Sequence, residues 1–229
     1  MTNSAKIKEI FDSIQGEGPY IGFRQLFIRF CECNLKCNYC DTNFAPNEGY
    51  TAFSPEALKN YINSNFELSK IHSISLTGGE PLLSWEFLQD FLPLAKHEFN
   101  KNIYLETNGT LFEELLKIKP HLTTIAADIK LESATGLNTF NLHNKFFANC
   151  KGTETFAKIV FNENITNYEI QECLNLAKKY DLPIILQPQT INDKICISPE
   201  FIQNIMDKFC SKWQNTRLIP QTHKFVGLE

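Results

Sequence analysis

The sequence predicts a parallel α/β fold, either a doubly wound sheet or a sheet curled into part of a barrel. Short runs rich in β-branched and aromatic residues recur along the chain, and segments with helical spacing alternate with them. The chain has 229 residues, of which 43% are hydrophobic, so one substantial core can be buried. We therefore expect a single domain, residues 1–229, with modest additions.

The expected elements follow from these two patterns. Six strands are predicted at about residues 24–30, 71–77, 102–107, 123–129, 156–161 and 184–188. Four segments have helical spacing, at residues 54–66, 84–99, 167–180 and 198–210. Ser54 can cap the first of these helices, and Pro55 suits its first turn. Ser84 should open the second in the same way, and Pro93 should kink or interrupt it. Residues 131–153 fit neither the helical nor the strand spacing well. They are expected to form an irregular insertion next to the functional site.

Composition and charge narrow the class of partner. The net charge is −4 and the isoelectric point is near 5.8, with no basic stripe along the chain. This argues against a nucleic-acid partner held through phosphates and favours a small molecule. No apolar run approaches the ~20 residues that cross a bilayer, and the N-terminus lacks the apolar core of a signal peptide. A cytoplasmic protein without a membrane partner is expected.

The chain has eight cysteines, four of which lie in the ten residues 31–40, CECNLKCNYC. Disulfides are not expected, because a chain of this size needs none and a reducing cytoplasm keeps thiols free. The remaining cysteines are scattered and are expected to be ordinary small buried residues: Cys150, Cys173, Cys196 and Cys210.

Polar motifs end four of the predicted strands. TGGE, ETNG, DIK and QPQ each stand at the carboxyl end of a strand. Parallel α/β proteins build their active sites at this edge of the sheet. Strand ends are also ordinary places for glycine and asparagine, but four such ends beside a cysteine-rich loop indicate one shared site.

Cys33, Cys37 and Cys40 are spaced as CxxxCxxC. This spacing would also place three buried thiols on one face of a helix, but the surrounding residues are mostly polar. A structural zinc site would need four ligands, but a second ligand pair is missing. Three thiolates on a four-iron, four-sulfur cluster would leave one iron open. Electron carriers usually close all four positions, so an open iron favours an enzyme that binds a small molecule there.

The segment CNLKCNYC resembles the signature of radical S-adenosylmethionine (SAM) enzymes, and TGGEP at residues 77–81 resembles their GGE motif. The resemblance implies a partial (β/α)6 barrel of the TIM-like, radical SAM type with modified or irregular helical segments. It also implies a 4Fe–4S cluster on Cys33, Cys37 and Cys40, with SAM chelating the open iron. Reductive cleavage of SAM would then give a radical that abstracts a hydrogen from the substrate.

Further motifs resemble the 7-carboxy-7-deazaguanine synthase family of queuosine biosynthesis, a tRNA modification pathway: SIQGEGPYIG, FIR, CDT, ETNG, DIKLESATG and PQTHK. The likeness runs from about residue 9 to the end and weakens across 43–70 and 131–180. It implies conversion of 6-carboxy-5,6,7,8-tetrahydropterin to 7-carboxy-7-deazaguanine with release of ammonia. It also implies Mg²⁺ as a cofactor, ligated by the hydroxyl of Thr42. A substrate turn (residues 13–22), a cluster loop (31–42) and a substrate tail (217–229) are expected.

The resemblance also assigns the remaining site residues. For SAM it implies Tyr39, Cys40, Asp41, Gly79, Glu80, Thr107, Asn108, Asp128, Ile129, Lys130 and Gln187. For the substrate it implies Ile14, Gln15, Gly16, Glu17, Arg29, Thr77, His223 and Glu229, the last through its main-chain carboxylate. Arg29 also stands out by itself, because it interrupts an apolar strand and could grip a carboxylate with two hydrogen bonds.

One position departs from the family pattern. The family usually has glycine before the first cluster cysteine, where this chain has Glu32, preceded by the extra Cys31. If the strand continues to residue 31, alternation places Cys31 on the same face as Arg29, near the site without being a ligand.

Two other functions remain open. A glycyl-radical enzyme activase shares CxxxCxxC and GGEP, although SIQGEG, CDT and the PQTHK tail argue against it. A non-enzymatic iron–sulfur electron carrier is opposed by the open fourth ligand. As partners, the resemblance implies a flavodoxin-like or ferredoxin-like electron donor and a second copy of the chain in a homodimer.

Overall fold

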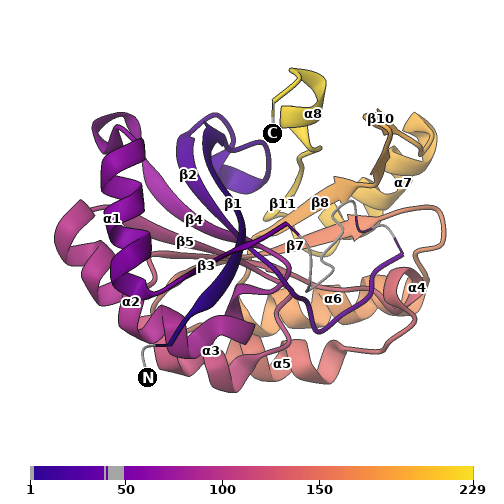
Figure 1. Cartoon of the computed structure of the whole chain (residues 1–229). Helices are drawn as coiled ribbons and strands as arrows, with labels where there is room; N and C mark the ends of the chain where they lie inside the picture. The colour runs from indigo at the N-terminus through magenta and orange to yellow at the C-terminus, as the bar shows by residue number, and fades with distance from the viewer. Residues whose placement is uncertain (1–2, 39, 41–48, 229) are drawn as a thin grey trace.

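The computed structural model describes residues 3–38, 40 and 49–228. Its main sheet has the strand order β11-β8-β7-β6-β5-β4-β2-β1-β3 among these residues (Figure 1). The strands are, in that order, Thr216–Leu218, Ile184–Pro188, Glu154–Phe161, Thr124–Asp128, Asn102–Thr107, Ser73–Gly78, Arg24–Phe30, Ala5–Ile14 and Thr51–Phe53. β11 through β2 are parallel, whereas β1 and β3 are antiparallel to their neighbours. A separate hairpin pairs β9 (Thr190–Ile191) with β10 (Lys194–Ile195).

The six predicted strands are all present as the parallel strands β2, β4, β5, β6, β7 and β8. The sheet does not close on itself within the described residues, because β11 and β3 end its strand order. The predicted partial barrel is therefore confirmed. β1 was missed, because AKIKEIFDSI is largely polar and packs only partly against the core.

Six helices lie in a row outside the sheet, each in contact with the next (Figure 1). They are α1 (Pro55–Asn65), α2 (Trp85–Phe99), α3 (Phe112–Ile118), α5 (Phe140–Asn149), α6 (Asn167–Tyr180) and α7 (Pro199–Cys210). Shorter helices are α4 (Glu132–Thr135), α8 (Thr222–Phe225), and the 3-10 turns η1 (Gly18–Tyr20), η2 (Leu68–Lys70), η3 (Pro81–Ser84) and η4 (Lys119–His121). No helix in the described part of the chain combines the length and the apolar character needed to span a membrane.

Side-chain alternation divides each parallel strand into an apolar outer face and a more polar inner face. On β4, Ile74 and Leu76 are fully buried in the main core, whereas Thr77 lines the cavity on the inner face. On β5, Leu105 belongs to the main core and Glu106 lines the same cavity. The outer face therefore holds the helices, and the inner face holds the site.

Two predicted helix starts fared differently. Ser54 caps α1, since its hydroxyl accepts a hydrogen bond of 3.3 Å from the backbone N–H of Ala57. Ser84 makes no such bond and ends the 3-10 turn η3, so the predicted cap is wrong. Helix α2 also continues through Pro93 without interruption. Pro93 is exposed, so water can reach the carbonyl group that lacks an N–H partner.

The expectation of an irregular insertion at 131–153 is also wrong. This segment contains α4 and the ten-residue helix α5. The buried face of α5 is formed by Phe140, His143, Phe146 and Phe147, at helical spacing. Four asparagines between residues 138 and 149 weakened the helical pattern in the sequence.

Candidate active site

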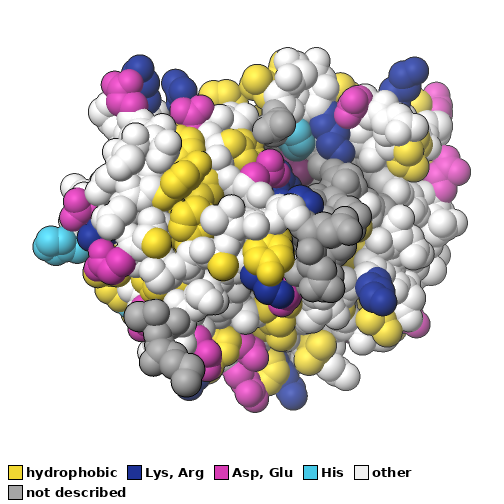
Figure 2. All heavy atoms as spheres, viewed as in Figure 1, with side chains coloured by type: hydrophobic (Ala, Val, Ile, Leu, Met, Phe, Trp, Pro, Cys, Tyr) yellow, Lys and Arg dark blue, Asp and Glu magenta, His cyan; other side chains and the backbone are white. Residues whose placement is uncertain are grey.

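The carboxyl ends of the parallel strands open into a cavity of about 820 Å³. Charged side chains of both signs gather around the hollow on this face (Figure 2). Most predicted site residues line it: Ile14, Gln15, Gly16, Glu17, Arg29, Cys33, Cys37, Cys40, Thr77, Gly79, Thr107, Asn108, Asp128, Lys130, Gln187 and His223. The fold thus brings predicted residues from eight separate segments of the chain to one cavity: 14–17, 29, 33–40, 77–79, 107–108, 128–130, 187 and 223. Tyr39, Asp41, Thr42 and Glu229 lie outside the described residues.

One end of the cavity carries the three cysteines of the CxxxCxxC motif. The side-chain amide of Asn108 points to the Cys33 sulfur at 3.9 Å and donates to Asn34 Oδ1 at 2.7 Å. The backbone N–H of Leu35 also donates to the Cys33 sulfur at 3.5 Å. Burial raises the pKa of the Cys33 and Cys37 thiols, and N–H donors aimed at a sulfur favour its thiolate form.

All eight cysteines are free thiols. Cys31 is buried just beyond β2 and is not among the residues that line the cavity, whereas the three motif cysteines are. Cys150 and Cys173 are buried as predicted. Cys196 is exposed and Cys210 only partly buried, so the expectation of burial was wrong for these two.

The backbone of the cluster loop packs directly on the GGE segment. The carbonyl oxygen of Glu32 accepts a hydrogen bond of 2.8 Å from the backbone N–H of Glu80. A Cβ atom on Gly79 would lie only 1.8 Å from that same oxygen, so no side chain fits there. Glu32 has φ +66°, in the left-handed region that glycine prefers. This explains why glycine suits the position, and this chain adopts the left-handed conformation there with glutamate.

Two residues predicted to bind SAM do not line the cavity. Glu80 is fully buried, and its carboxylate accepts hydrogen bonds from Thr107 Oγ1 at 2.8 Å and from the backbone N–H of Asn108 at 2.7 Å. It also accepts one from the backbone N–H of Leu82 at 3.1 Å. Burial raises the pKa of Glu80 to about 7, although these hydrogen bonds act to lower it. Glu80 therefore joins the ends of β4 and β5. The side chain of Ile129 belongs to the core, between the cavity-lining residues Asp128 and Lys130 in the sequence.

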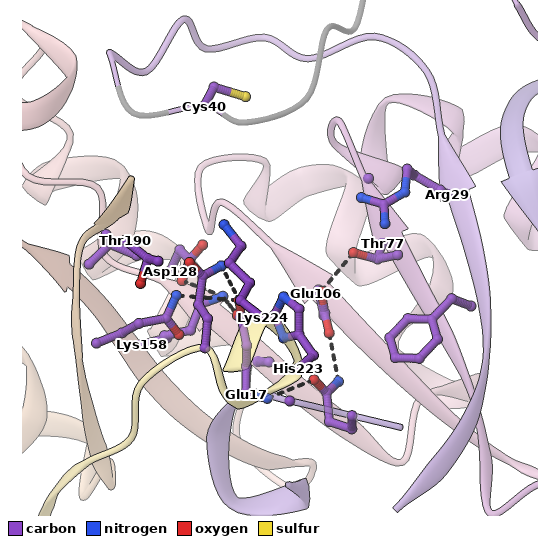
Figure 3. Close-up of a pocket in the computed structure, with 18 of the residues that line it drawn as sticks. Glu17, Arg29, Cys40, Thr77, Glu106, Asp128, Lys158, Thr190, His223 and Lys224 are labelled. Atoms are coloured by element: carbon purple, nitrogen blue, oxygen red, sulfur yellow. Dashed lines mark hydrogen bonds and ion pairs between the residues drawn. The ribbon is translucent and has the colours of Figure 1, made fainter. Parts of the chain in front are cut away.

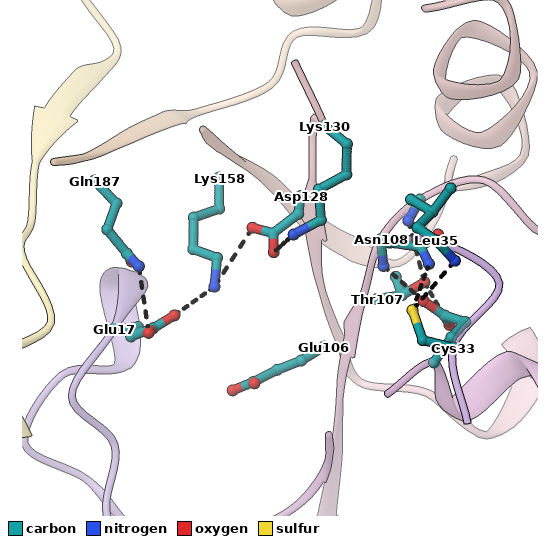
Figure 4. A network of polar contacts seen from close by, with 12 residues as sticks. Glu17, Cys33, Leu35, Glu106, Thr107, Asn108, Asp128, Lys130, Lys158 and Gln187 are labelled. Carbon is teal, nitrogen blue, oxygen red and sulfur yellow. Dashed lines mark hydrogen bonds and ion pairs between the residues drawn. The ribbon is translucent and has the colours of Figure 1, made fainter. Parts of the chain in front are cut away.

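A buried charge network crosses the inner face of the sheet (Figure 4). Lys158 on β7 forms ion pairs with Glu17 in the substrate turn and, at 3.4 Å, with Asp128 on β6. Asp128 also pairs with Lys130 at 2.8 Å. Burial alone would lower the pKa of Lys158, but Asp128, Glu17 and Glu106 raise it well above its usual value. The lysine therefore stays charged and holds its partners in place.

Glu17 is held from three sides. Besides Lys158, it accepts hydrogen bonds from Gln221 at 2.8 Å and from Gln187 at 3.3 Å. Burial alone would raise the pKa of Glu17, but Lys158 and Gln221 lower it to about 2. Glu17 is thus a fixed carboxylate at neutral pH.

Glu106 lies at the centre of the cavity (Figure 3). It accepts hydrogen bonds from Thr77 at 2.6 Å and from Gln15 at 2.9 Å. Burial raises the pKa of Glu106, Lys158 lowers it, and Glu17 raises it again, so that the net shift is upward. A raised pKa brings the charged and protonated forms of a carboxyl group closer in free energy at neutral pH. Such a group can accept a proton during a reaction.

Arg29 lies on β2, in register with Thr77 on β4, and it lines the cavity (Figure 3). Its Nε forms an ion pair of 2.5 Å with Glu9, and its guanidinium stacks over the Phe11 ring at 5.4 Å. β2 is not an edge strand, because it pairs with both β1 and β4. Arg29 is therefore a fixed cation in the wall of the cavity.

The tail closes the cavity against the substrate turn. The backbone N–H and hydroxyl of Thr222 both donate to the carbonyl oxygen of Gly16, at 3.0 and 3.1 Å. A Cβ atom on Gly16 would lie 2.2 Å from the ring of His223, so glycine is required for this contact. Segments that are 206 residues apart in sequence thus form one wall.

Among the cavity-lining residues that the sequence did not identify, three belong to the polar network around Glu17 and the substrate turn. They are Glu106, Lys158 and Gln221. Lys158 had a signal, since a lysine interrupts the buried strand TFAKIVF much as Arg29 interrupts LFIRF. Glu106 opens the ETNG motif but was not assigned a role. Gln221 had no signal beyond its place in the PQTHK tail.

The cavity suits both a cluster and SAM. Within the described residues, no three His, Cys, Asp or Glu side chains converge on a single metal ion. A 4Fe–4S cluster does not require this, because each cysteine binds a different iron. At the opposite side, Gln187 Oε1 and Thr190 Oγ1 are buried, have no hydrogen-bond partner within the described structure, and belong to residues that line the cavity. Such atoms suit the amino and hydroxyl groups of a bound nucleoside.

Residues 27–192 match the family model described as the radical SAM superfamily, so the chain belongs to that superfamily. Membership implies a 4Fe–4S cluster and SAM. In the solved structures, QueE from Escherichia coli has a TM-score of 0.67 at 20% identity and covers 95% of this chain and 94% of that one. A radical SAM methyltransferase from Sphaerobacter thermophilus has a TM-score of 0.61 at 14% identity, covering 86% and 66%. Both likenesses establish the fold.

Curated relatives identify the family within the superfamily. The 7-carboxy-7-deazaguanine synthase of Geobacter sulfurreducens is 34% identical, with 97% of each chain covered. That of Archaeoglobus fulgidus is 36% identical, with 98% of this chain and 99% of the relative covered. The chain therefore belongs to the 7-carboxy-7-deazaguanine synthase family and is a radical SAM lyase. The predicted radical SAM role in 7-deazapurine biosynthesis is confirmed at this level and replaces the two alternatives.

Proposed function

We propose that this chain converts 6-carboxy-5,6,7,8-tetrahydropterin to 7-carboxy-7-deazaguanine with release of ammonia, in queuosine and 7-deazapurine biosynthesis. The observation that carries the proposal is that one cavity holds both the cluster cysteines and a buried wall of paired charges. A carboxylated pterin has an N–H-rich aminopyrimidine edge and an anionic group. It therefore needs hydrogen-bond acceptors and a cation in the same site.

The acceptors are Glu17 and Glu106. Glu17 is fixed in the charged form by Lys158, and Glu106 has hydrogen bonds from Thr77 and Gln15 but no ion pair among the described residues. Two carboxyl groups of this kind suit the ring N–H and amino groups of a pterin. We assign Glu106 the further role of taking up a proton from the ring, since its pKa is raised by burial.

The cation for the substrate carboxylate is Arg29, whose guanidinium is held by Glu9 and Phe11. A planar guanidinium can make two parallel hydrogen bonds to a carboxylate, which fixes orientation as well as position. His223 and the terminal carboxylate of Glu229 would complete the pocket from the tail side. The bound cluster and SAM would supply the hydrogen-abstracting radical chemistry of the superfamily.

SAM is assigned to the strand ends. Its proposed contacts are Tyr39, Cys40, Asp41, Gly79, Thr107, Asn108, the backbone of residues 128–130, and Gln187. The support lies in the three strand-end loops that line one side of the cavity beside the cysteines. The unpartnered Gln187 Oε1 fits a nucleoside donor.

Further parts of the proposal rest on the resemblance. Thr42 is assigned as a ligand of Mg²⁺, an ion that keeps several waters and accepts substrate oxygens. A flavodoxin-like or ferredoxin-like protein is proposed as electron donor. A homodimer and a cytoplasmic location are proposed in the same way.

The test is anaerobic turnover. Wild-type protein with a reconstituted cluster, given the tetrahydropterin, SAM, Mg²⁺ and a reductant, should form 7-carboxy-7-deazaguanine and ammonia, detected by mass spectrometry. A Glu106→Gln variant should keep the cluster but lose at least tenfold in kcat. Absence of product from wild-type protein with an intact cluster would overturn the proposed function.

A further inference from the structure

His143 is a buried histidine that has no role in the proposed function. It lies on α5, is fully buried, and is not among the described residues that line the cavity. Its ring stands between two strand-end loops. Nδ1 lies 3.1 Å from the carbonyl oxygen of Gly109, after β5, and Nε2 lies 3.0 Å from the backbone nitrogen of Lys130, after β6.

The partners fix the protonation of the ring. A carbonyl oxygen only accepts hydrogen bonds, so Nδ1 must carry a proton that it donates to Gly109. A backbone N–H only donates, so Nε2 must be unprotonated to accept from Lys130. Protonation of both nitrogens would place two donors face to face. Burial and the charge of Lys130 lower the pKa of His143 to about 4, although the hydrogen bond to Gly109 and the charge of Asp128 oppose this shift.

Thr139 completes the arrangement. Its hydroxyl lies 3.0 Å from His143 Nε2 and donates to the carbonyl oxygen of Lys130 at 2.9 Å. Both backbone groups of Lys130 are therefore held by residues of the 139–143 segment. The Lys130 side chain, by contrast, pairs with Asp128 at the cavity.

The two loops joined in this way carry proposed SAM contacts. Thr107 and Asn108 immediately precede Gly109, and Asp128 stands two residues before Lys130. A single side chain, that of His143, thus bonds to the backbone of both loops. The imidazole ring, which lies on α5 and outside the cavity lining, thus sets the separation between the loops that follow β5 and β6.

We propose that His143, as the neutral Nδ1–H tautomer, is a positioning residue for SAM binding that acts through the backbone of Gly109 and Lys130. This role rests on the proposed assignment of those loops to SAM. His143 does not touch the cofactor or the substrate. Its loss should therefore change recognition of SAM more than the cluster or the pterin site.

Three variants separate the two contacts. His143→Leu removes both hydrogen bonds. His143→Asn can still donate to Gly109 from the position of Nδ1, and His143→Gln can still accept from Lys130 from the position of Nε2. Leu174→Ala is the matched control, because Leu174 is fully buried on α6, outside the two loops, and its apolar side chain forms no hydrogen bond.

The first measurement is equilibrium binding of SAM to the reconstituted protein, with iron content and unfolding temperature determined on the same samples. His143→Leu should raise the Kd for SAM at least tenfold with iron content unchanged, and His143→Asn and His143→Gln should lie between it and the wild type. The KM for the pterin should change less than twofold. Leu174→Ala should lower the unfolding temperature and leave the Kd for SAM within twofold.

The outcomes distinguish this role from a purely structural one. A His143→Leu protein that binds SAM with the wild-type Kd would overturn the inference, as would a Kd that simply follows the unfolding temperature across all variants. Wild-type protein that fails to bind SAM at all would overturn the proposed function together with this inference.

The second measurement does not use SAM. ¹⁵N NMR of histidine-labelled, oxidised holoprotein should find His143 neutral and protonated on Nδ1 between pH 5 and 8. A ring protonated on Nε2, or one that titrates near the ordinary histidine pKa of about 6.5, would contradict the geometry on which the inference depends.

Discussion

At the scale of the residue, position 32 combines a strained backbone with a local compensation. Glu32 has φ +66°, and its side chain reaches Lys6 at 2.8 Å on the exposed surface. The left-handed conformation destabilises the folded state by roughly 1–2 kcal/mol when the residue is not glycine. Glycine would relieve this strain, but its greater conformational freedom in the unfolded chain would offset part of the gain. Exposed ion pairs contribute little.

We therefore expect Glu32→Gly to raise the free energy of unfolding by about 0.5 kcal/mol, with unchanged iron content. Urea denaturation of the two proteins side by side would measure this. Lys6→Ala is the control, since it removes the ion pair and keeps the strain. If Glu32→Gly is less stable than Lys6→Ala, the strain argument is wrong.

The choice between Cys31 and Cys33 is also made at single residues. Cys31 is buried away from the cavity, and burial raises the pKa of its thiol. Cys33 lines the cavity and receives hydrogen bonds from Leu35 and Asn108. Cys31→Ala should keep the full iron content after reconstitution, whereas Cys33→Ala should lose the cluster. Iron and sulfide analysis decides, and equal loss in both would show that the three ligands are misassigned.

Glu17 gives the charge network a defined dependence on pH. Its pKa is lowered from 4.5 to about 2 in the folded protein. Because the folded pKa is depressed, the stabilisation is complete above pH 4.5 and is lost as the pH falls toward 2. A shift of this size corresponds to on the order of 3 kcal/mol.

Glu17→Gln should therefore be less stable than the wild type near pH 7, because Lys158 loses a charged partner. The difference in free energy of unfolding should shrink as the pH is lowered through 4.5. Urea denaturation at several pH values between 7 and 3 would measure it. A difference that stays constant or grows in acid would contradict the network as described.

At the scale of the element, α2 keeps its helical path through an unfavourable residue. Pro93 lies inside Trp85–Phe99, exposed, and cannot donate to the carbonyl group of Gln89. The helix persists because its other face buries Phe87, Phe91 and Ala95 in the core. Tertiary packing thus outweighs local preference here.

Pro93→Ala should restore the missing hydrogen bond and raise the free energy of unfolding by about 2 kcal/mol. The substitution lies on the outer face, so the Kd for SAM should not change. Gln89→Ala is the matched control and should shift stability by less than about 0.5 kcal/mol. A Pro93→Ala protein no more stable than this control would mean that α2 has adapted its backbone to proline.

At the scale of the whole molecule, the sequence predicted the sheet better than its surroundings. Each parallel strand is a short apolar run that ends in a polar motif, so both its place and its functional edge could be recognised. Helix α5 could not, because its buried face emerges only once Phe140, His143 and Phe147 pack between neighbours.

Site residues that belong to short sequence motifs could be predicted. Those whose place in the site depends on how neighbouring strands pair could not. Asp128 and Lys158 face each other because β6 and β7 pair in that register, and the sequence alone does not give this pairing. Glu106 likewise gains its partners from β4 and the substrate turn. Long-range pairing therefore accounts for most of what the sequence missed.

The first and last segments of the chain meet at the cavity, which makes the tail a test of the whole arrangement. Gln221 donates to Glu17, and Thr222 donates twice to Gly16, whereas the remainder of the fold is completed before them by β11. Deleting residues 221–229 should therefore leave the unfolding temperature within about 3 °C of the wild type. Iron content and the Kd for SAM should also be unchanged.

Turnover of the pterin should nevertheless fall at least 100-fold in the deleted protein, because one wall of the pocket is missing. Gly16→Ala offers an independent route to the same state, since a Cβ atom there would collide with the His223 backbone nitrogen, at 2.6 Å, and displace the tail. Steady-state product formation with and without each change gives the comparison. If the shortened protein keeps the wild-type kcat and KM, the tail does not belong to the substrate site, and the contacts at Gly16 and Glu17 serve the fold alone.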